Sequence, residues 1–104
     1  MIAVVSQSRS ARSSGLLSAG TTTVSNTANT LSGVIVLSDA VNTATITVYD
    51  HASAASGTVL AKLVATVGTG ANSLALATPI RAENGLTVVV AGTGTPTGII
   101  LYGA

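Results

Sequence analysis

The sequence predicts an all-β domain, an antiparallel β-sandwich or jelly roll of about six to eight short strands. Three observations predict it. Threonine and valine are abundant, and β-branched side chains suit strands. Short runs alternate between apolar and polar residues, and stretches rich in glycine, asparagine or proline separate these runs. The chain is 47% hydrophobic but only 2% aromatic, and its apolar content is mainly alanine, valine, leucine and isoleucine.

The first half of the chain holds three of the expected strands. Residues 16–25 (LLSAGTTTVS) form a possible first strand that glycine interrupts. In residues 30–39 (TLSGVIVLSD) apolar side chains occupy both faces, which predicts a strand buried on both sides. Residues 43–50 (TATITVYD) alternate, so one face is expected to carry Ala44, Ile46 and Val48, and the other Thr45, Thr47 and Tyr49.

The second half supplies the remaining strands. Residues 58–67 (TVLAKLVATV) alternate, which would place Val59 with Ala61, Leu63, Ala65 and Val67 on one face. In residues 73–80 (SLALATPI), Pro79 ends the strand or places it at a sheet edge, because proline lacks a backbone donor. LTVVVA and TGIILYGA complete the set, and Asn84-Gly85 predicts a tight turn because both residues tolerate positive φ.

A length of 104 residues fits one domain, which we place at residues 16–104, behind an N-terminal arm at residues 1–15. The arm is either a frayed terminus or a strap that becomes ordered on a neighbouring subunit. In the second interpretation the arm supplies the partner-binding residues. Apolar Met1, Ile2, Val4 and Val5 would be buried on the neighbour, and Arg9 and Arg12 would pair with its acidic groups.

The low charge argues against some partners and favours others. Charged residues make up 7% of the chain, against about 25% in ordinary soluble domains. Four basic residues, a net charge of +1 and few aromatic rings predict no nucleic-acid binding. No apolar run approaches the roughly 20 residues of a membrane span, so no membrane association is expected. Such a chain is expected to form an oligomer or to dock on another protein, the alternative being a monomer with a serine and threonine surface.

Asp50-His51 is the one pair that invites a search for catalysis. Neighbours on a strand point to opposite faces, so they cannot act together there. The chain has one histidine, three carboxylates and no cysteine, which is too few for a predicted metal centre. We therefore expect no catalytic, cofactor-binding or metal-binding residues and no enzyme activity. Asp39 and Asp50 stand at predicted strand ends, where aspartate commonly caps a turn through its own backbone.

Three stretches together support a resemblance: ITVYDHASAASGTVLAKL, TPIRAENGLTVVVAG and the terminal TGIILYGA. Their order over residues 31–103 resembles small β-sandwich virion proteins of tailed bacteriophages, which decorate or cement capsids or belong to tail fibres. In those proteins a strand ending in a Tyr-Asp-type turn leads to a strand that begins with a Ser-Gly pair. A Gly-Leu segment follows, and the chain closes on a strand that ends in tyrosine.

The resemblance implies a structural virion protein, most simply a capsid decoration or cement protein. It implies self-association, expected as a homotrimer, and binding to the major capsid protein or to other virion subunits. The location would be the virion, assembled in the host cytoplasm, and no cofactor would be needed. The alternatives are a subunit of the tail or tail fibre, or a carbohydrate-binding module. The scarcity of aromatic residues counts against the sugar-binding alternative.

Overall fold

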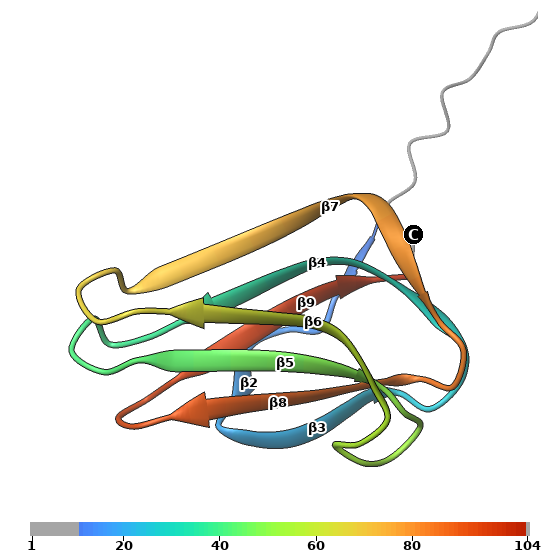
Figure 1. Ribbon diagram of the computed structural model, residues 1–104, viewed down its shortest axis with the longest axis horizontal. Helices are drawn as coiled ribbons and strands as arrows, with labels where there is room; N and C mark the ends of the chain where they lie inside the picture. The colour runs from blue at the N-terminus through green and yellow to red at the C-terminus, as the bar shows by residue number, and fades with distance from the viewer. Residues whose placement is uncertain (1–10, 104) are drawn as a thin grey trace, which may run out of the picture.

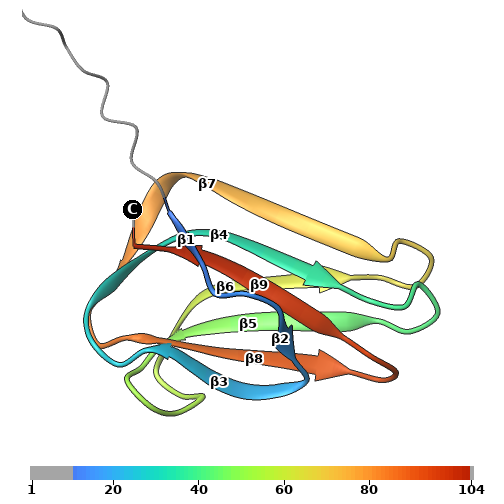
Figure 2. The ribbon, with the colours of Figure 1, turned by 180° about the vertical axis from the view of Figure 1, so that it is seen from behind.

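A computed structural model describes residues 11–103, which form nine strands and no helix (Figures 1 and 2). The strands are β1 (Arg12–Ser13), β2 (Leu17–Ser18), β3 (Gly20–Ser25), β4 (Asn29–Leu37), β5 (Ala44–Asp50), β6 (Thr58–Ala65), β7 (Ala71–Ala82), β8 (Leu86–Gly92) and β9 (Thr97–Tyr102). Every strand pairing is antiparallel. The predicted all-β class is therefore confirmed.

The strands build two facing sheets. One has the order β1-β9-β4-β7 with β2 also paired to β9, and the other has the order β3-β8-β5-β6. Because β1 and β2 pair with successive parts of β9, they act as one interrupted edge strand. The chain changes sheet at every connection from β2 to β9 except the β5-β6 hairpin, which is the arrangement of a jelly roll. The described residues form nine strands, and the expectation was six to eight. The difference arises because two segments of only two residues each, β1 and β2, count as separate strands.

The predicted first strand belongs to both sheets. Its first part is β2, which pairs with β9, and its second part is β3, which pairs with β8. The chain passes between the sheets at Ala19-Gly20, and Gly20 has a φ of 123°. Glycine adopts this conformation without the steric cost that a side chain would bring.

Only one of the predicted partner-binding residues lies in the described part of the chain. Met1, Ile2, Val4, Val5 and Arg9 are outside the described residues. Arg12 lies in β1, directly opposite Tyr102 of β9. The described part of the predicted arm is thus hydrogen-bonded to a sheet edge.

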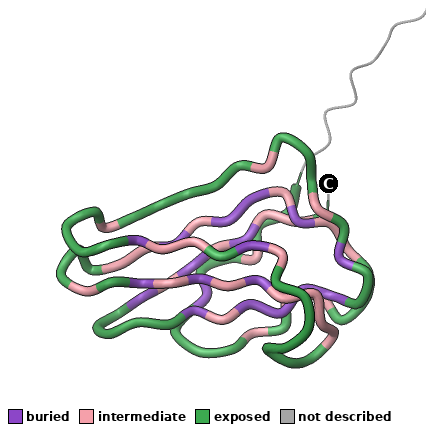
Figure 3. The backbone as a smooth tube through the Cα atoms, viewed as in Figure 1, coloured by how far each residue is buried: buried purple, intermediate pink, exposed green. Residues whose placement is uncertain are grey.

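Buried residues lie on strands of both sheets (Figure 3). The core that they form is made of aliphatic side chains. On β5, Ala44, Ile46 and Val48 are buried, which confirms the inner face predicted from the alternation. The other buried apolar residues are Leu17, Leu31, Val34, Val36, Ala61, Ala65, Ala82, Leu86, Val88, Val90 and Ile100.

Strand β6 departs from simple alternation at its start. Ala61 and Ala65 share one buried face, in keeping with the predicted alternation, but Val59 is 49% exposed and Val67, beyond the end of the strand, is 65% exposed. The register shifts here, because Val48 pairs with Ala61 while the next residue, Tyr49, pairs with Val59. The extra residue, Leu60, makes a β-bulge and packs against the core in place of Val59.

The sheets come close together where β9 lies over β5. A Cβ atom added at Gly98 would lie 2.6 Å from Cδ1 of Ile46 and 3.2 Å from Cγ2 of Val90. The side chain of Ile46 therefore fills the space that a β9 side chain would otherwise occupy.

The predicted edge position of the Pro79 strand is also confirmed, since β7 pairs only with β4.

We predict that Ile46→Asn lowers the free energy of unfolding by about 3 kcal/mol or more, because it removes core packing and buries an unpaired amide. Urea unfolding followed by circular dichroism measures this change. Thr45→Asn is the matched control, because Thr45 is the preceding residue and points away from the core. Equal unfolding midpoints for the two variants would contradict the assigned inner face.

Candidate functional site

Asp50 ends β5 and caps the turn that joins β7 to β8. Its Oδ1 accepts hydrogen bonds from the backbone N–H of Asn84 (2.8 Å) and of Gly85 (3.4 Å), and its Oδ2 accepts one from that of Glu83 (3.1 Å). Asp50 was predicted to cap a turn in its own stretch of backbone, but the turn that it caps is more than thirty residues away in the chain. The N–H groups of Asn84 and then Glu83 lower the pKa of the Asp50 carboxyl below its ordinary value.

The Asn84-Gly85 turn exists, but its backbone differs from the prediction. Asn84 does not have positive φ, because within residues 11–103 only Ala40 among the non-glycine residues does. The Asp50 carboxylate holds the turn instead. Gly85 is needed for space, since a Cβ atom there would lie 2.5 Å from the carbonyl oxygen of Ser25 and 2.8 Å from that of His51.

His51 closes the loop that follows β5. Its Nδ1 accepts hydrogen bonds from the backbone N–H of Ser53 (3.0 Å) and Ala54 (2.9 Å). Its carbonyl oxygen accepts one from the hydroxyl of Thr87 (2.9 Å), which is fully buried. The Asp50-His51 pair therefore organises two turns. Within residues 11–103, no three histidine, cysteine or acidic side chains gather as a metal site would require.

Asp39 is the second predicted turn cap, and it caps its own loop. Its Oδ1 accepts hydrogen bonds from the N–H groups of Val41 (2.9 Å) and Asn42 (2.8 Å), and its Oδ2 accepts one from the Asn42 amide (2.9 Å). These bonds, the backbone one from Asn42 first, lower the pKa of the Asp39 carboxyl. Two of the three carboxylates of the chain are thus used to hold loops.

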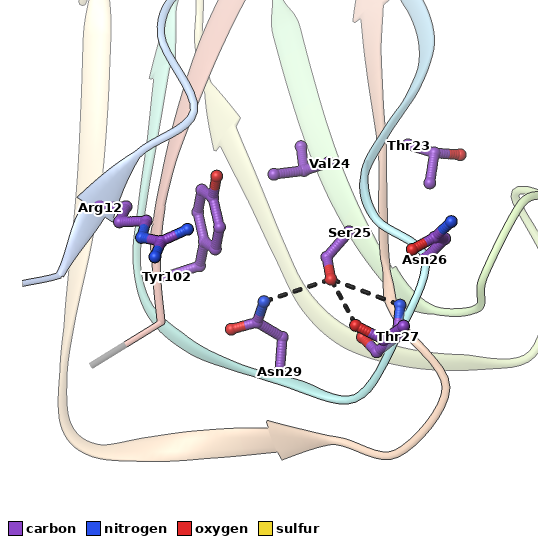
Figure 4. A pocket seen from close by; sticks show the side chains of 8 residues that line it. All are labelled: Arg12, Thr23, Val24, Ser25, Asn26, Thr27, Asn29 and Tyr102. Atoms are coloured by element: carbon purple, nitrogen blue, oxygen red, sulfur yellow. Dashed lines mark hydrogen bonds between the residues drawn. The ribbon is translucent and has the colours of Figure 1, made fainter.

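A pocket of about 480 Å³ opens at the end of the sandwich where the two sheets separate (Figure 4). One wall comes from β1, β4 and β9, and the opposite wall comes from the end of β3 and the link that follows it. The lining residues are Arg12, Thr23, Val24, Ser25, Asn26, Thr27, Asn29 and Tyr102. No acidic residue is among them.

Hydrogen bonds within the pocket fix the link between β3 and β4. The Ser25 hydroxyl donates to the carbonyl oxygen of Thr27 (3.0 Å) and accepts from the Asn29 amide (3.2 Å). The Oδ1 of Asn29 accepts from the N–H of Thr30 (2.8 Å). Ser25 and Asn29 therefore shape the wall. Sequence reasoning named Arg12 as a partner-binding residue but did not predict the pocket, because residues from three separate places in the chain meet only in the folded protein.

The second candidate feature is the outward side of the five-stranded sheet. Its centre consists of Ile35 and Leu37 on β4 and of Ile99 and Leu101 on β9, which we call the outer apolar face. Ile35 lies directly opposite Ile99 in the pairing of the two strands. All four side chains are half-buried, although no other layer of the described chain covers them. The burial predicted for both sides of β4 is thus complete only on the inner side, at Val34 and Val36.

The outward side of the other sheet is more polar. Thr21 on β3 and Thr47 on β5 both pair with Val89 on β8, and Lys62 pairs with Thr47 from the other side. Thr21 and Lys62 are exposed. The two outward sides of the sandwich therefore differ in character, with apolar side chains concentrated on one of them.

Comparisons with protein-family models, with curated proteins and with solved structures return no match to this chain. Within residues 11–103, no helix has the length and apolar content needed to cross a membrane.

We predict that Asp50→Asn destabilises the protein at pH 7, because the amide loses the charge that strengthens the bonds to the β7–β8 turn. The folded-state pKa of Asp50 lies below the ordinary value of 3.8. Its stabilising contribution is therefore complete above that value and is lost as the pH falls through the folded-state pKa. The difference in unfolding midpoint between Asp50→Asn and the unaltered protein should shrink below about pH 4.

Urea unfolding at pH 7 and at a series of lower pH values measures this difference. Glu83→Gln is the matched control, because the one contact recorded for the Glu83 carboxylate within residues 11–103 is an exposed one with Arg81 at 3.6 Å. A difference at Asp50 that stays constant with pH would show that the carboxylate charge does not stabilise the turn.

Proposed function

We propose that this protein is a structural subunit of a phage virion, a decoration or cement protein that binds the head shell as a multimer, in its simplest form a homotrimer. The major capsid protein, or another virion subunit, is its partner, and the virion is assembled in the host cytoplasm. The outer apolar face is the observation that carries this proposal. It is a group of four half-buried aliphatic side chains over which the described chain places no further layer.

The geometry of this face suits close packing against another protein. A Cβ atom added at Gly33 would lie 3.2 Å from Cδ1 of Leu101, so the Leu101 side chain occupies the space beside Gly33 on β4. No charged residue interrupts the described parts of β4 or β9. The cores of protein interfaces are depleted of charge in the same way. A contact of ordinary size, about 800 Å² per partner, could include the whole of the outer apolar face.

The edge of the same sheet favours a partner as well. Strand β7 has twelve residues, and none of them is charged before Arg81. Natural edge strands usually carry charges that prevent pairing with other chains, as Lys62 does on the edge strand β6. An assembled shell that covers both the face and the edge would remove the risk of unwanted association.

The architecture is consistent with this role. Jelly rolls are frequent in viral capsid and lectin domains, although a fold alone does not decide a function. The resemblance of residues 31–103 to small phage virion proteins points in the same direction. The proposed mechanism is non-enzymatic. Apolar area leaves water on attachment, many copies act together, and binding to the assembled shell stabilises that state by mass action.

We predict that Ile99→Lys weakens attachment at least tenfold, because it places a charge in the middle of the apolar contact. Co-sedimentation with purified phage shells that lack decoration measures attachment, and light scattering of the free protein measures its mass. The unaltered chain should bind as a trimer. Thr21→Lys, on the opposite sheet, is the matched control and should leave both results unchanged.

Attachment of Ile99→Lys with the affinity of the unaltered chain would overturn the proposed role of this face. Attachment of the unaltered chain to tails and not to head shells would replace the decoration role by that of a tail subunit. Unfolding curves of both variants establish that any loss of attachment is not a loss of fold.

A further inference from the structure

The pocket between Arg12 and Tyr102 has the size and position of a ligand site. Its volume of about 480 Å³ lies within the range of small-molecule clefts, roughly 300–1,000 Å³. It opens at the end of the sandwich, whereas the outer apolar face covers the side of one sheet. Ligand binding there and attachment to a shell can therefore be tested separately.

The charge of the pocket selects an anion. Arg12 is the one charged residue in the lining. Within residues 11–103 the structure records one ion pair, between Arg81 and Glu83, so no acidic side chain of that range neutralises Arg12. The planar guanidinium matches the two oxygens of a carboxylate and binds them through parallel hydrogen bonds.

The aromatic ring adds a flat surface next to that charge. Tyr102 faces Arg12 across the β1–β9 pairing, and Figure 4 shows its ring beside the Arg12 side chain. The ring packs partly against the core, which limits its movement. A tyrosine ring has an apolar face and a polar hydroxyl. The face can pack against C–H groups of a ligand, and the hydroxyl can form hydrogen bonds with its O–H groups.

The remaining polar groups divide into those that build the wall and those that are available to a ligand. Ser25 and Asn29 are hydrogen-bonded to each other and hold the wall. For the Asn26 amide and the Tyr102 hydroxyl, the structure records no side-chain hydrogen bond within residues 11–103. An amide and a phenol can each donate and accept, which suits the hydroxyl groups of a sugar.

We propose that this pocket binds an acidic sugar, a pyranose ring that carries a carboxylate. The Arg12 guanidinium binds the carboxylate, the Tyr102 ring packs against the C–H face of the sugar, and the Asn26 amide bonds to ring hydroxyls. A neutral sugar leaves Arg12 without its partner. A simple carboxylate such as acetate lacks the ring that Tyr102 and Asn26 contact.

The chain is suited to a direct test by proton NMR, because its only aromatic side chains besides His51 are Tyr49 and Tyr102. The full chain is titrated with D-glucuronate, with D-glucose and with acetate. Glucose has the sugar ring without the carboxylate, and acetate has the carboxylate without the ring. Tyr102→Phe assigns the two sets of ring signals. Tyr49 lies on β5, outside the pocket lining, and serves as the internal control.

Glucuronate should shift the Tyr102 ring signals saturably, with an affinity at least tenfold higher than that of glucose or acetate, and should leave Tyr49 unchanged. Arg12→Gln should weaken glucuronate binding at least tenfold without changing the response to glucose, and Asn26→Ala should weaken it severalfold. Arg81→Gln, an arginine outside the pocket, is the matched control. Unfolding curves establish that the variants are folded.

Three results would overturn the proposal. The first is that glucuronate leaves the Tyr102 signals unshifted, as expected if an acidic group already occupies Arg12. The second is that acetate binds as well as glucuronate, which would reduce the pocket to a site for any small anion. The third is that Arg12→Gln binds glucuronate with unaltered affinity. None of these results bears on attachment to shells.

Discussion

The close contact between the two sheets is the constraint on which the rest of the structure depends. The described core contains only alanine, valine, leucine and isoleucine. Because these side chains are small, the sheets must approach closely to exclude water. Gly98 makes this possible by leaving room for Ile46. Where the sheets separate at one end, Val24 and Tyr102 pack at the border of the core, and the pocket opens beside them.

The few charged groups of the chain serve this architecture. Asp39 and Asp50 hold loops through backbone N–H groups, and Glu83 pairs with Arg81 at the surface. Arg12 is different, because it lies in a pocket that has no acidic lining residue. The carboxylates of the chain are therefore used to maintain the fold, whereas Arg12 places a positive charge in the pocket.

The sequence predicted what depends on neighbouring residues and missed what depends on distant ones. Alternation in residues 43–50 identified the inner face of β5, and Pro79 identified an edge strand. The change of sheet at Gly20 and the bulge at Leu60 depend on pairing partners, which a local pattern does not reveal. The pocket was beyond prediction for the same reason, since Arg12 and Tyr102 meet only through the pairing of β1 with β9.

In the proposed role the outer apolar face is covered when the protein is attached to a shell, and thiol labelling measures this cover. The chain has no cysteine, so Ile99→Cys and Thr21→Cys each provide a single reactive group. The rate of maleimide labelling is measured for each variant when free and when bound to shells. We expect strong protection of Cys at position 99 on binding and little change at position 21. Equal labelling rates at position 99 in the free and bound states would contradict it.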